Sequence, residues 1–180
     1  MGPADSRSGL SAAPSDNVSA QAARAAGAPA SVSLLVLRVG RTSYAMPVHD
    51  VIEVVQMVAT TPAPDAPAWS SELINFRGRV VPLIDTRVRL GLDHVEPDLS
   101  TPIVVMQIGE NAAGLIVDEV VDVVSVPQDQ LLSPAPATPS ASLLTSVARL
   151  DERLILVLDQ NRICDVSELS SAAAAWQMQP

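Results

Sequence analysis

The sequence contains no lysine, and this absence excludes several kinds of chemistry. All 11 basic residues among the 180 are arginine. Neither the lysine of a phosphate-binding P-loop nor the lysine of a Schiff base is therefore available. Cysteine is represented by Cys164 alone, which excludes an intramolecular disulfide and a cysteine-based metal cluster. We expect Cys164 to be a buried residue without a chemical role.

Long apolar runs are missing as well. No stretch approaches ~18 uninterrupted apolar residues, and residues 1–33 lack the basic and apolar regions of a secretory signal. The net charge of −9 disfavours binding to phosphate backbones and anionic lipids, since no arginine cluster offers a local exception. We therefore expect a cytoplasmic protein with no nucleic-acid partner and no direct membrane insertion.

The composition changes near residue 32. Residues 1–31 are rich in Ala, Ser, Gly and Pro, so no burial would offset the entropy of ordering them, and we expect a flexible tail. Beyond them, short runs of Val, Ile and Leu are broken by Gly, Pro, Asn and Asp, which predicts many short strands. A helix is predicted only at residues 166–175, with Ser167 as its N-cap. The predicted strands are 34–39, 44–48, 51–58, 80–84, 103–108, 114–117, 120–126, 143–150 and 154–158.

An internal repeat relates these predicted strands. Residues 37–55 align with residues 106–124 at a shift of 69, and this alignment places Gly40 on Gly109 at a hairpin. Residues 79–85 align with residues 153–159 at a shift of 74. Two copies of a set of about five strands would close into two small barrels filled by side chains. Chance similarity between valine-rich strands is the alternative explanation.

The segment ELINFRGRVVPLIDTRVRLGL, residues 72–92, resembles the signature of the CheW family of chemotaxis coupling proteins. In that signature a strand leads to an Asn-x-Arg-Gly turn and then to a run that ends in Pro-x-Ile-Asp. Other segments match the family in order, so the resemblance covers about residues 34–165. They are YAMPVHDVIEVV (44–55), GLIVDEVVDVVSVP (114–127), the Pro-Ala-Pro connection (134–136) and ERLILVLD (152–159).

The resemblance implies an all-β fold of two interlocked SH3-like barrels with about five strands each, and a short C-terminal helix follows. The predicted organisation is a tail at 1–31, a CheW-like domain with two pseudo-repeated barrels at 32–168, and an extension at 169–180. It also implies an adaptor without catalytic activity, cofactor or metal. Its partners would be the regulatory domain of a CheA-type histidine kinase and the cytoplasmic tip of a methyl-accepting chemoreceptor, in arrays at the inner membrane.

The resemblance assigns partner contacts to four residues. The arginine of the turn falls on Arg77, followed by Gly78, and the acidic residue of the strand after the first hairpin falls on Glu53. Val51 lies two residues earlier on the same face. An arginine on a tight turn presents a rigid fork to carboxylate or carbonyl groups of a partner. A salt bridge between Arg77 and Glu53 within the fold is the alternative role, and the two roles are compatible.

Two residues depart from the family pattern. Glu72 stands where the family usually has glycine, so its side chain would obstruct a close approach or require a different backbone angle. Receptor contact is then in question, and a module that sequesters the kinase without binding a receptor becomes the alternative function. Thr86 stands where leucine is usual, and we expect this smaller, partly polar residue to loosen the local packing.

Two groups of polar residues raise other functions. His49 and His94, each next to an aspartate in a polar turn, would serve a small hydrolase, but no G-x-S-x-G elbow is present and a solvated turn is the simpler interpretation. Asp118, Glu119 and Asp122 would suit a divalent cation only if they shared a face. A strand sends adjacent side chains to opposite faces, so we expect a solvated edge that resists aberrant pairing.

Overall fold

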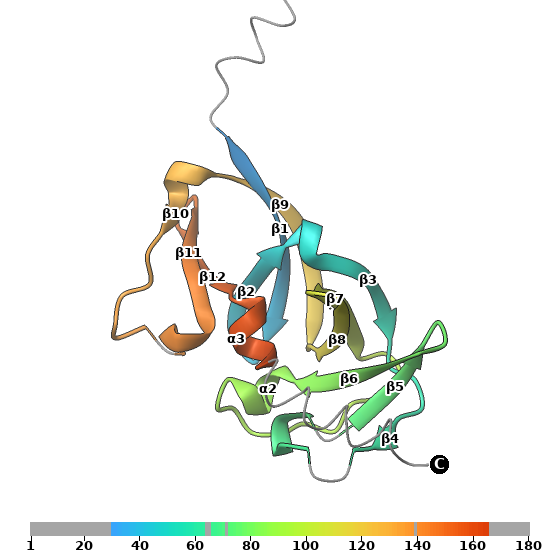
Figure 1. The fold of residues 1–180 in the computed structure, drawn as a ribbon. Coiled ribbons are helices and arrows are strands. Elements are labelled where there is room, and N and C mark those ends of the chain that lie inside the picture. The colour runs from blue at the N-terminus through green and yellow to red at the C-terminus, as the bar shows by residue number, and fades with distance from the viewer. Residues whose placement is uncertain (1–29, 64–65, 71, 139, 166–180) are drawn as a thin grey trace, which may run out of the picture. The chain divides into compact units, whose positions relative to one another are not determined.

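The computed structural model describes residues 30–63, 66–70, 72–138 and 140–165. Nearly all of the predicted tail, the predicted helix 166–175 and the predicted extension 169–180 lie outside these described residues. The chain divides into the units Met1–Ala30 and Ser31–Pro180. The architecture below is that of the second unit (Figure 1).

The described residues form two six-stranded sheets, which confirms the predicted all-β class. The pairings do not join the outer strands of either sheet within the described residues, so neither sheet closes into a barrel by backbone hydrogen bonds. The strands are β1 Ser31–Val39, β2 Thr42–Pro47, β3 Val51–Gln56, β4 Thr61–Pro62, β5 Glu72–Phe76, β6 Arg79–Asp85, β7 Pro102–Ile108, β8 Asn111–Ile116, β9 Glu119–Pro127, β10 Leu131–Leu132, β11 Leu144–Leu150 and β12 Arg153–Leu158. The first sheet has the order β10-β11-β12-β2-β1-β9 and the second has the order β3-β7-β8-β6-β5-β4.

The predicted repeat is present in the strand pairing. When β7, β8, β6 and β3 are matched to β1, β2, β12 and β9, both sheets have the same strand order. The parallel pair Leu83↔Gly114 of the second sheet corresponds to Val157↔Ala45 of the first sheet. Chance similarity would not reproduce the register of a parallel pair, so the two halves are copies of one arrangement.

Glycines and aspartates mark equivalent positions in the two halves. Gly40, between β1 and β2, has φ 62°, and Gly109, between β7 and β8, has φ 57°. Both turns need the left-handed backbone region that glycine enters without steric cost. Asp85 is the last residue of β6 and Asp159 directly follows β12, and they cap the short helices α2 Thr86–Arg89 and α3 Gln160–Cys164.

Neither α2 nor α3 was predicted. Each begins where an aspartate carboxylate accepts a backbone N–H of the first turn, from Val88 at 3.1 Å and from Asn161 at 3.0 Å. Further 3-10 segments are Val48–Asp50, Ala68–Ser70, Gln128–Gln130 and Ala141–Leu143. In the described part of the chain, no helix has the length and apolar character needed to span a membrane.

The two sheets exchange chain segments. The N-terminal hairpin β1–β2 belongs to the sheet of β9–β12, whereas β3–β8 form the other sheet. β1 lies beside β9, more than 80 residues later in the chain, and β2 pairs in parallel with β12 (Figure 1). This exchange is the interlocking that the family resemblance implied.

Three apolar clusters hold the sheets together. The largest contains residues from both sheets, and each of the other two belongs to one sheet. β1 is buried on both faces, since Leu35 and Leu37 join the shared cluster while Leu34 and Val36 join that of the first sheet. β7 divides its side chains between two clusters in the same way. Strands buried on two faces explain why these segments read as continuous apolar runs rather than as alternating ones.

Candidate partner-binding site

The β5–β6 turn presents Arg77 in an unusual backbone conformation. Phe76 pairs with Arg79, so only Arg77 and Gly78 form the loop, with φ of 51° and 79°. Two positive φ angles are the pattern of a type I′ hairpin, which favours asparagine or glycine at the first position. The Asn75 side chain accepts a hydrogen bond from the Gly78 N–H at 2.8 Å. The turn therefore has a fixed shape that holds Arg77 outward despite the cost of the left-handed conformation.

The Arg77 guanidinium is oriented by two contacts. It forms an ion pair with Glu53 on β3, and it lies 5.2 Å from the ring centroid of Phe76. The predicted ion pair is thus present. The Arg77 side chain nevertheless remains 70% exposed and that of Glu53 37% exposed. Both charged groups are held in place and accessible to a partner.

Val51 has a different environment from Glu53. It is half-buried and packs against the cluster shared by the two sheets. The pairing of β3 with β7 is irregular between Val51 and Glu53. The structure therefore brings Glu53, Arg77 and Gly78 together, whereas Val51 contributes mainly to the core. Sequence reasoning missed Phe76, whose ring supports the Arg77 guanidinium. The only feature of the sequence that pointed to Phe76 is its position directly before Arg77.

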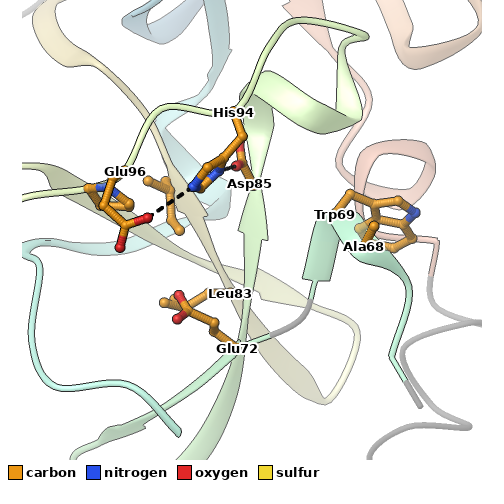
Figure 2. Close-up of a pocket in the computed structure, with 9 residues that line it drawn as sticks. Ala68, Trp69, Glu72, Leu83, Asp85, His94 and Glu96 are labelled. Atoms are coloured by element: carbon orange, nitrogen blue, oxygen red, sulfur yellow. Dashed lines mark hydrogen bonds and ion pairs between the residues drawn. The ribbon is translucent and has the colours of Figure 1, made fainter. Parts of the chain in front are cut away.

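His94 lies in a pocket of about 170 Å³ beside the end of β6 (Figure 2). Its Nδ1 is 2.6 Å from Asp85 Oδ2 and its Nε2 is 3.3 Å from Glu96 Oε2. Hydrogen bonds to Asp85 and then to Glu96 raise the pKa of His94 above its ordinary value. Asp93 directly precedes His94 in the sequence but is not its hydrogen-bond partner. The loop folds back onto β6, which brings the imidazole to Asp85.

Glu72 lines the same pocket (Figure 2). Its carboxylate accepts a hydrogen bond from the Thr60 hydroxyl at 3.0 Å. Glu72 is not among the residues with positive φ, so the backbone here does not require glycine. A backbone angle that differs from that of the family's glycine stays a prediction. The effect of the Glu72 side chain on receptor contact stays a prediction.

The carboxylates after β8 are bound by arginines. Asp118 Oδ2 accepts hydrogen bonds from the Gly40 N–H and from Arg87 Nη1, both at 2.7 Å. Glu119 pairs with Arg38. Within the described ranges, no three His, Cys, Asp or Glu residues are grouped so that they could hold a metal ion. Glu119 does lie on an edge strand as expected, but Asp118 anchors the β1–β2 turn and is not a solvated edge residue.

Cys164 is fully buried, as the sequence predicted. It ends α3 within the cluster shared by both sheets. Burial raises the pKa of the Cys164 thiol to about 12. The thiolate, which is the reactive form, is therefore scarce at neutral pH.

Comparison with known proteins identifies the family. Residues 33–168 match the CheW-like domain. A probable chemotaxis protein CheW of Rhizobium etli is 32% identical over 147 residues, which cover 78% of this chain and 91% of that protein. The chemotaxis protein CheW of Klebsiella aerogenes is 28% identical over 154 residues, 84% of this chain and 92% of that protein. The crystal structure of the scaffolding protein TtCheW from Thermoanaerobacter tengcongensis matches with a TM-score of 0.68 and 27% identity, over 74% of this chain and 88% of that chain. With a match over most of its length, this chain belongs to the CheW-like domain family.

Proposed function

We propose that this chain is a non-catalytic adaptor that couples chemoreceptors to a CheA-type histidine kinase in chemosensory signal transduction. The observation that carries the proposal is the exposed Arg77 guanidinium, held on a two-residue turn beside Glu53. The names of the relatives, which are chemotaxis proteins and a scaffolding protein, support the adaptor role. They do not favour a module that only sequesters the kinase.

The geometry at Arg77 suits recognition by a partner. An arginine whose side chain is already oriented loses little further conformational freedom on binding, so more of its hydrogen-bond energy contributes to affinity. Arginine is also enriched among the residues that dominate protein interfaces. Glu53 beside it adds a charge of the opposite sign. This pair would favour a partner that presents an acidic group to Arg77 and a basic group to Glu53.

The proposed partners are the regulatory domain of the kinase and the cytoplasmic tip of a chemoreceptor. The two sheets provide two separate surfaces, so one partner can bind at each. The adaptor would then act in the cytoplasm, at receptor arrays on the inner membrane.

A three-component assay tests the adaptor role. The purified chain is mixed with the CheA-type kinase and a cytoplasmic receptor fragment, and co-sedimentation and kinase autophosphorylation are measured. We expect both partners to sediment with the chain and receptor control of the kinase to require it. If the kinase binds and the receptor does not, the chain is a sequestering module, and Glu72→Gly becomes the variant that should restore receptor binding.

The same assay tests the site. Arg77→Ala should weaken binding of at least one partner, while Arg149→Ala is the matched control, because Arg149 is an exposed arginine of the first sheet that contacts Gln130. A folded Arg77→Ala variant that binds both partners as well as the unmodified chain does would remove Arg77 from the site.

A further inference from the structure

The loop between α2 and β7, residues 92–101, has little apolar anchoring. Leu92, Val95 and Leu99 are 39%, 55% and 78% exposed. Between residues 92 and 100, Pro97 is half-buried and every other residue is exposed. Burial of apolar side chains therefore contributes little to the position of the 92–101 loop, and polar contacts decide where it lies.

Both ends of this loop are fixed by hydrogen bonds. At the first end, the Leu92 N–H donates to the Arg87 carbonyl at 2.8 Å, and Arg87 Nε donates to the Asp93 carbonyl at 3.0 Å. At the other end, the Thr101 N–H donates to the Asp98 carbonyl at 3.0 Å. The two ends therefore keep their places even if the middle of the loop moves.

His94 is the polar link between the middle of the loop and the second sheet. Its Nδ1 contacts Asp85 of β6, and its Nε2 contacts Glu96 farther along the loop (Figure 2). Among the described residues, no other hydrogen bond or ion pair involves residues 94–97. The attachment of this part of the loop to the sheet thus depends on a single imidazole.

The two contacts of His94 require a protonated ring. Ionised carboxylates only accept hydrogen bonds, and a neutral imidazole has a single N–H, so both ring nitrogens can donate at once only in the imidazolium form. When the ring loses a proton, one nitrogen faces a carboxylate with a lone pair. The contact with Glu96 at 3.3 Å is longer than that with Asp85 at 2.6 Å, so the Glu96 contact is the weaker one and breaks.

The charges around the pocket favour the same movement. Three acids and one base line it: Glu72, Asp85 and Glu96, and His94. Arg87 of α2 is instead paired with Asp118 at 2.7 Å. A neutral His94 therefore leaves three carboxylates at one pocket without a cation among its lining residues, and like charges repel one another. Glu96 is the acid that is free to move, because its side chain is 92% exposed.

We propose that the 92–101 loop is a pH-sensitive switch. With His94 protonated, the loop closes one side of the pocket that contains Glu72, and with His94 neutral, Glu96 and Pro97 move away from this pocket. Both of these residues line the pocket, so their movement opens one of its walls. The switch would make a partner contact at Glu72 depend on pH. This consequence for a partner rests on the proposed adaptor function, whereas the switch itself does not.

NMR of the isotope-labelled full chain tests the switch. The ring protons of His94 report its protonation, and relaxation of the Cα–Hα groups, whose protons do not exchange with water, reports the mobility of the loop. We expect the order parameters of Val95 and Glu96 to fall from about 0.85 at about pH 6 to below about 0.6 at about pH 9. The fall should follow the titration of the ring. Asp98 and Thr101, at the fixed end of the loop, should stay near about 0.85.

Three variants identify the group responsible. In Glu96→Gln the new amide can accept a hydrogen bond from a protonated ring and donate one to a neutral ring, so the loop should stay ordered at both pH values. In His94→Gln the titrating group is gone, so the order of the loop should be the same at both pH values. His49→Gln is the matched control, because His49 is 76% exposed beside Asp50, and this variant should keep the fall in order.

The proposal is overturned if the His94 ring titrates in this interval without a fall in the order of the loop, or if the ring does not titrate there. It is also overturned if Glu96→Gln or His94→Gln shows the same fall as the unmodified chain. The measurement uses the chain alone, so a failed adaptor assay would not affect its result.

Discussion

Arg77 and Glu53 form an ion pair between opposite ends of the second sheet. Glu53 lies on β3, the first strand in the order of that sheet, and Arg77 lies on the turn between β6 and β5, its fourth and fifth strands. The two ends meet because the sheet curls, so side chains connect strands that the backbone ladder does not join. In the first sheet the equivalent residues are Asp122 and Asp151, and no such connection is possible.

Arg77→Asn should separate recognition from stability. Asparagine tolerates the left-handed conformation at this turn position better than arginine, whereas the exposed ion pair that it removes is worth about 0–1 kcal/mol. We expect a free energy of unfolding that is unchanged or higher by up to about 1 kcal/mol, with weaker partner binding. Urea denaturation and the co-sedimentation assay measure the two quantities. A large loss of stability would show that the ion pair, not the turn, controls the second sheet.

Gly114→Val should destabilise the second sheet. A Cβ at Gly114 would lie 2.7 Å from Leu83 Cδ2 and 2.8 Å from Ile103 Cγ2, both of them in buried side chains. Overpacking of this kind costs about 1–3 kcal/mol. Urea denaturation should therefore give a lower midpoint with the same slope. Asn111→Val, at an exposed position of the same strand, is the control and should change the midpoint little.

His94 should make stability depend on pH. Its pKa is raised in the folded chain by hydrogen bonds to Asp85 and Glu96, so folding favours the protonated form. This stabilisation is fully present below the unfolded pKa of about 6.5 and is lost as the pH rises through the higher folded pKa. NMR titration of the ring protons should place the pKa of His94 above the ordinary value for histidine.

His94→Gln tests whether His94 causes this pH dependence of the free energy of unfolding. The variant should lose the decline in stability above about pH 6.5 that the unmodified chain shows, while His49→Gln should keep it. The charged groups that contact the ring or line its pocket are Asp85, Glu96 and Glu72. If both variants show the same pH dependence, His94 is not the group responsible.

Thr86→Val should stabilise the chain. Thr86 is fully buried, and its hydroxyl has no hydrogen-bond partner among the described residues. Valine has a similar shape without the hydroxyl, so the substitution should raise the free energy of unfolding by about 1 kcal/mol. Thr101→Val is the opposite control, because the Thr101 hydroxyl hydrogen-bonds with Asp98. A Thr86→Val variant that loses stability would mean that the hydroxyl is satisfied by ordered water.

The repeat was the most reliable guide that the sequence offered to this fold. Gly40 and Gly109 are recognisable because few residues tolerate their turns, and Asp85 and Asp159 mark strand ends that are equivalent in both halves. Strands β4 and β10, with two residues each, are too short to show any alternation. Helices α2 and α3, with four and five residues, are likewise too short for a helical period.

The candidate site was only partly predictable. The family motif located Arg77 and Glu53, and their opposite charges suggested the ion pair across 24 residues. The left-handed conformation of Arg77 was not foreseeable, because the type of a two-residue turn follows from the twist of the flanking strands. The partner of His94 depends on how a loop folds back onto β6, and a local sequence pattern does not reveal that Asp85 is this partner.

The exchange of the N-terminal hairpin has a consequence for synthesis on the ribosome. β1 and β2 emerge first, yet their outer neighbours β9 and β12 are among the last segments to be translated. β3–β8 form a continuous stretch of the chain, so the second sheet can assemble before β9 and β12 are translated. During this interval the apolar LLVL segment of β1 has no strand β9 to pair with. Nascent chains are aggregation-prone in such an interval. Moving β1–β2 from before β3 to a position after β12 would remove this interval and should increase the yield of folded protein.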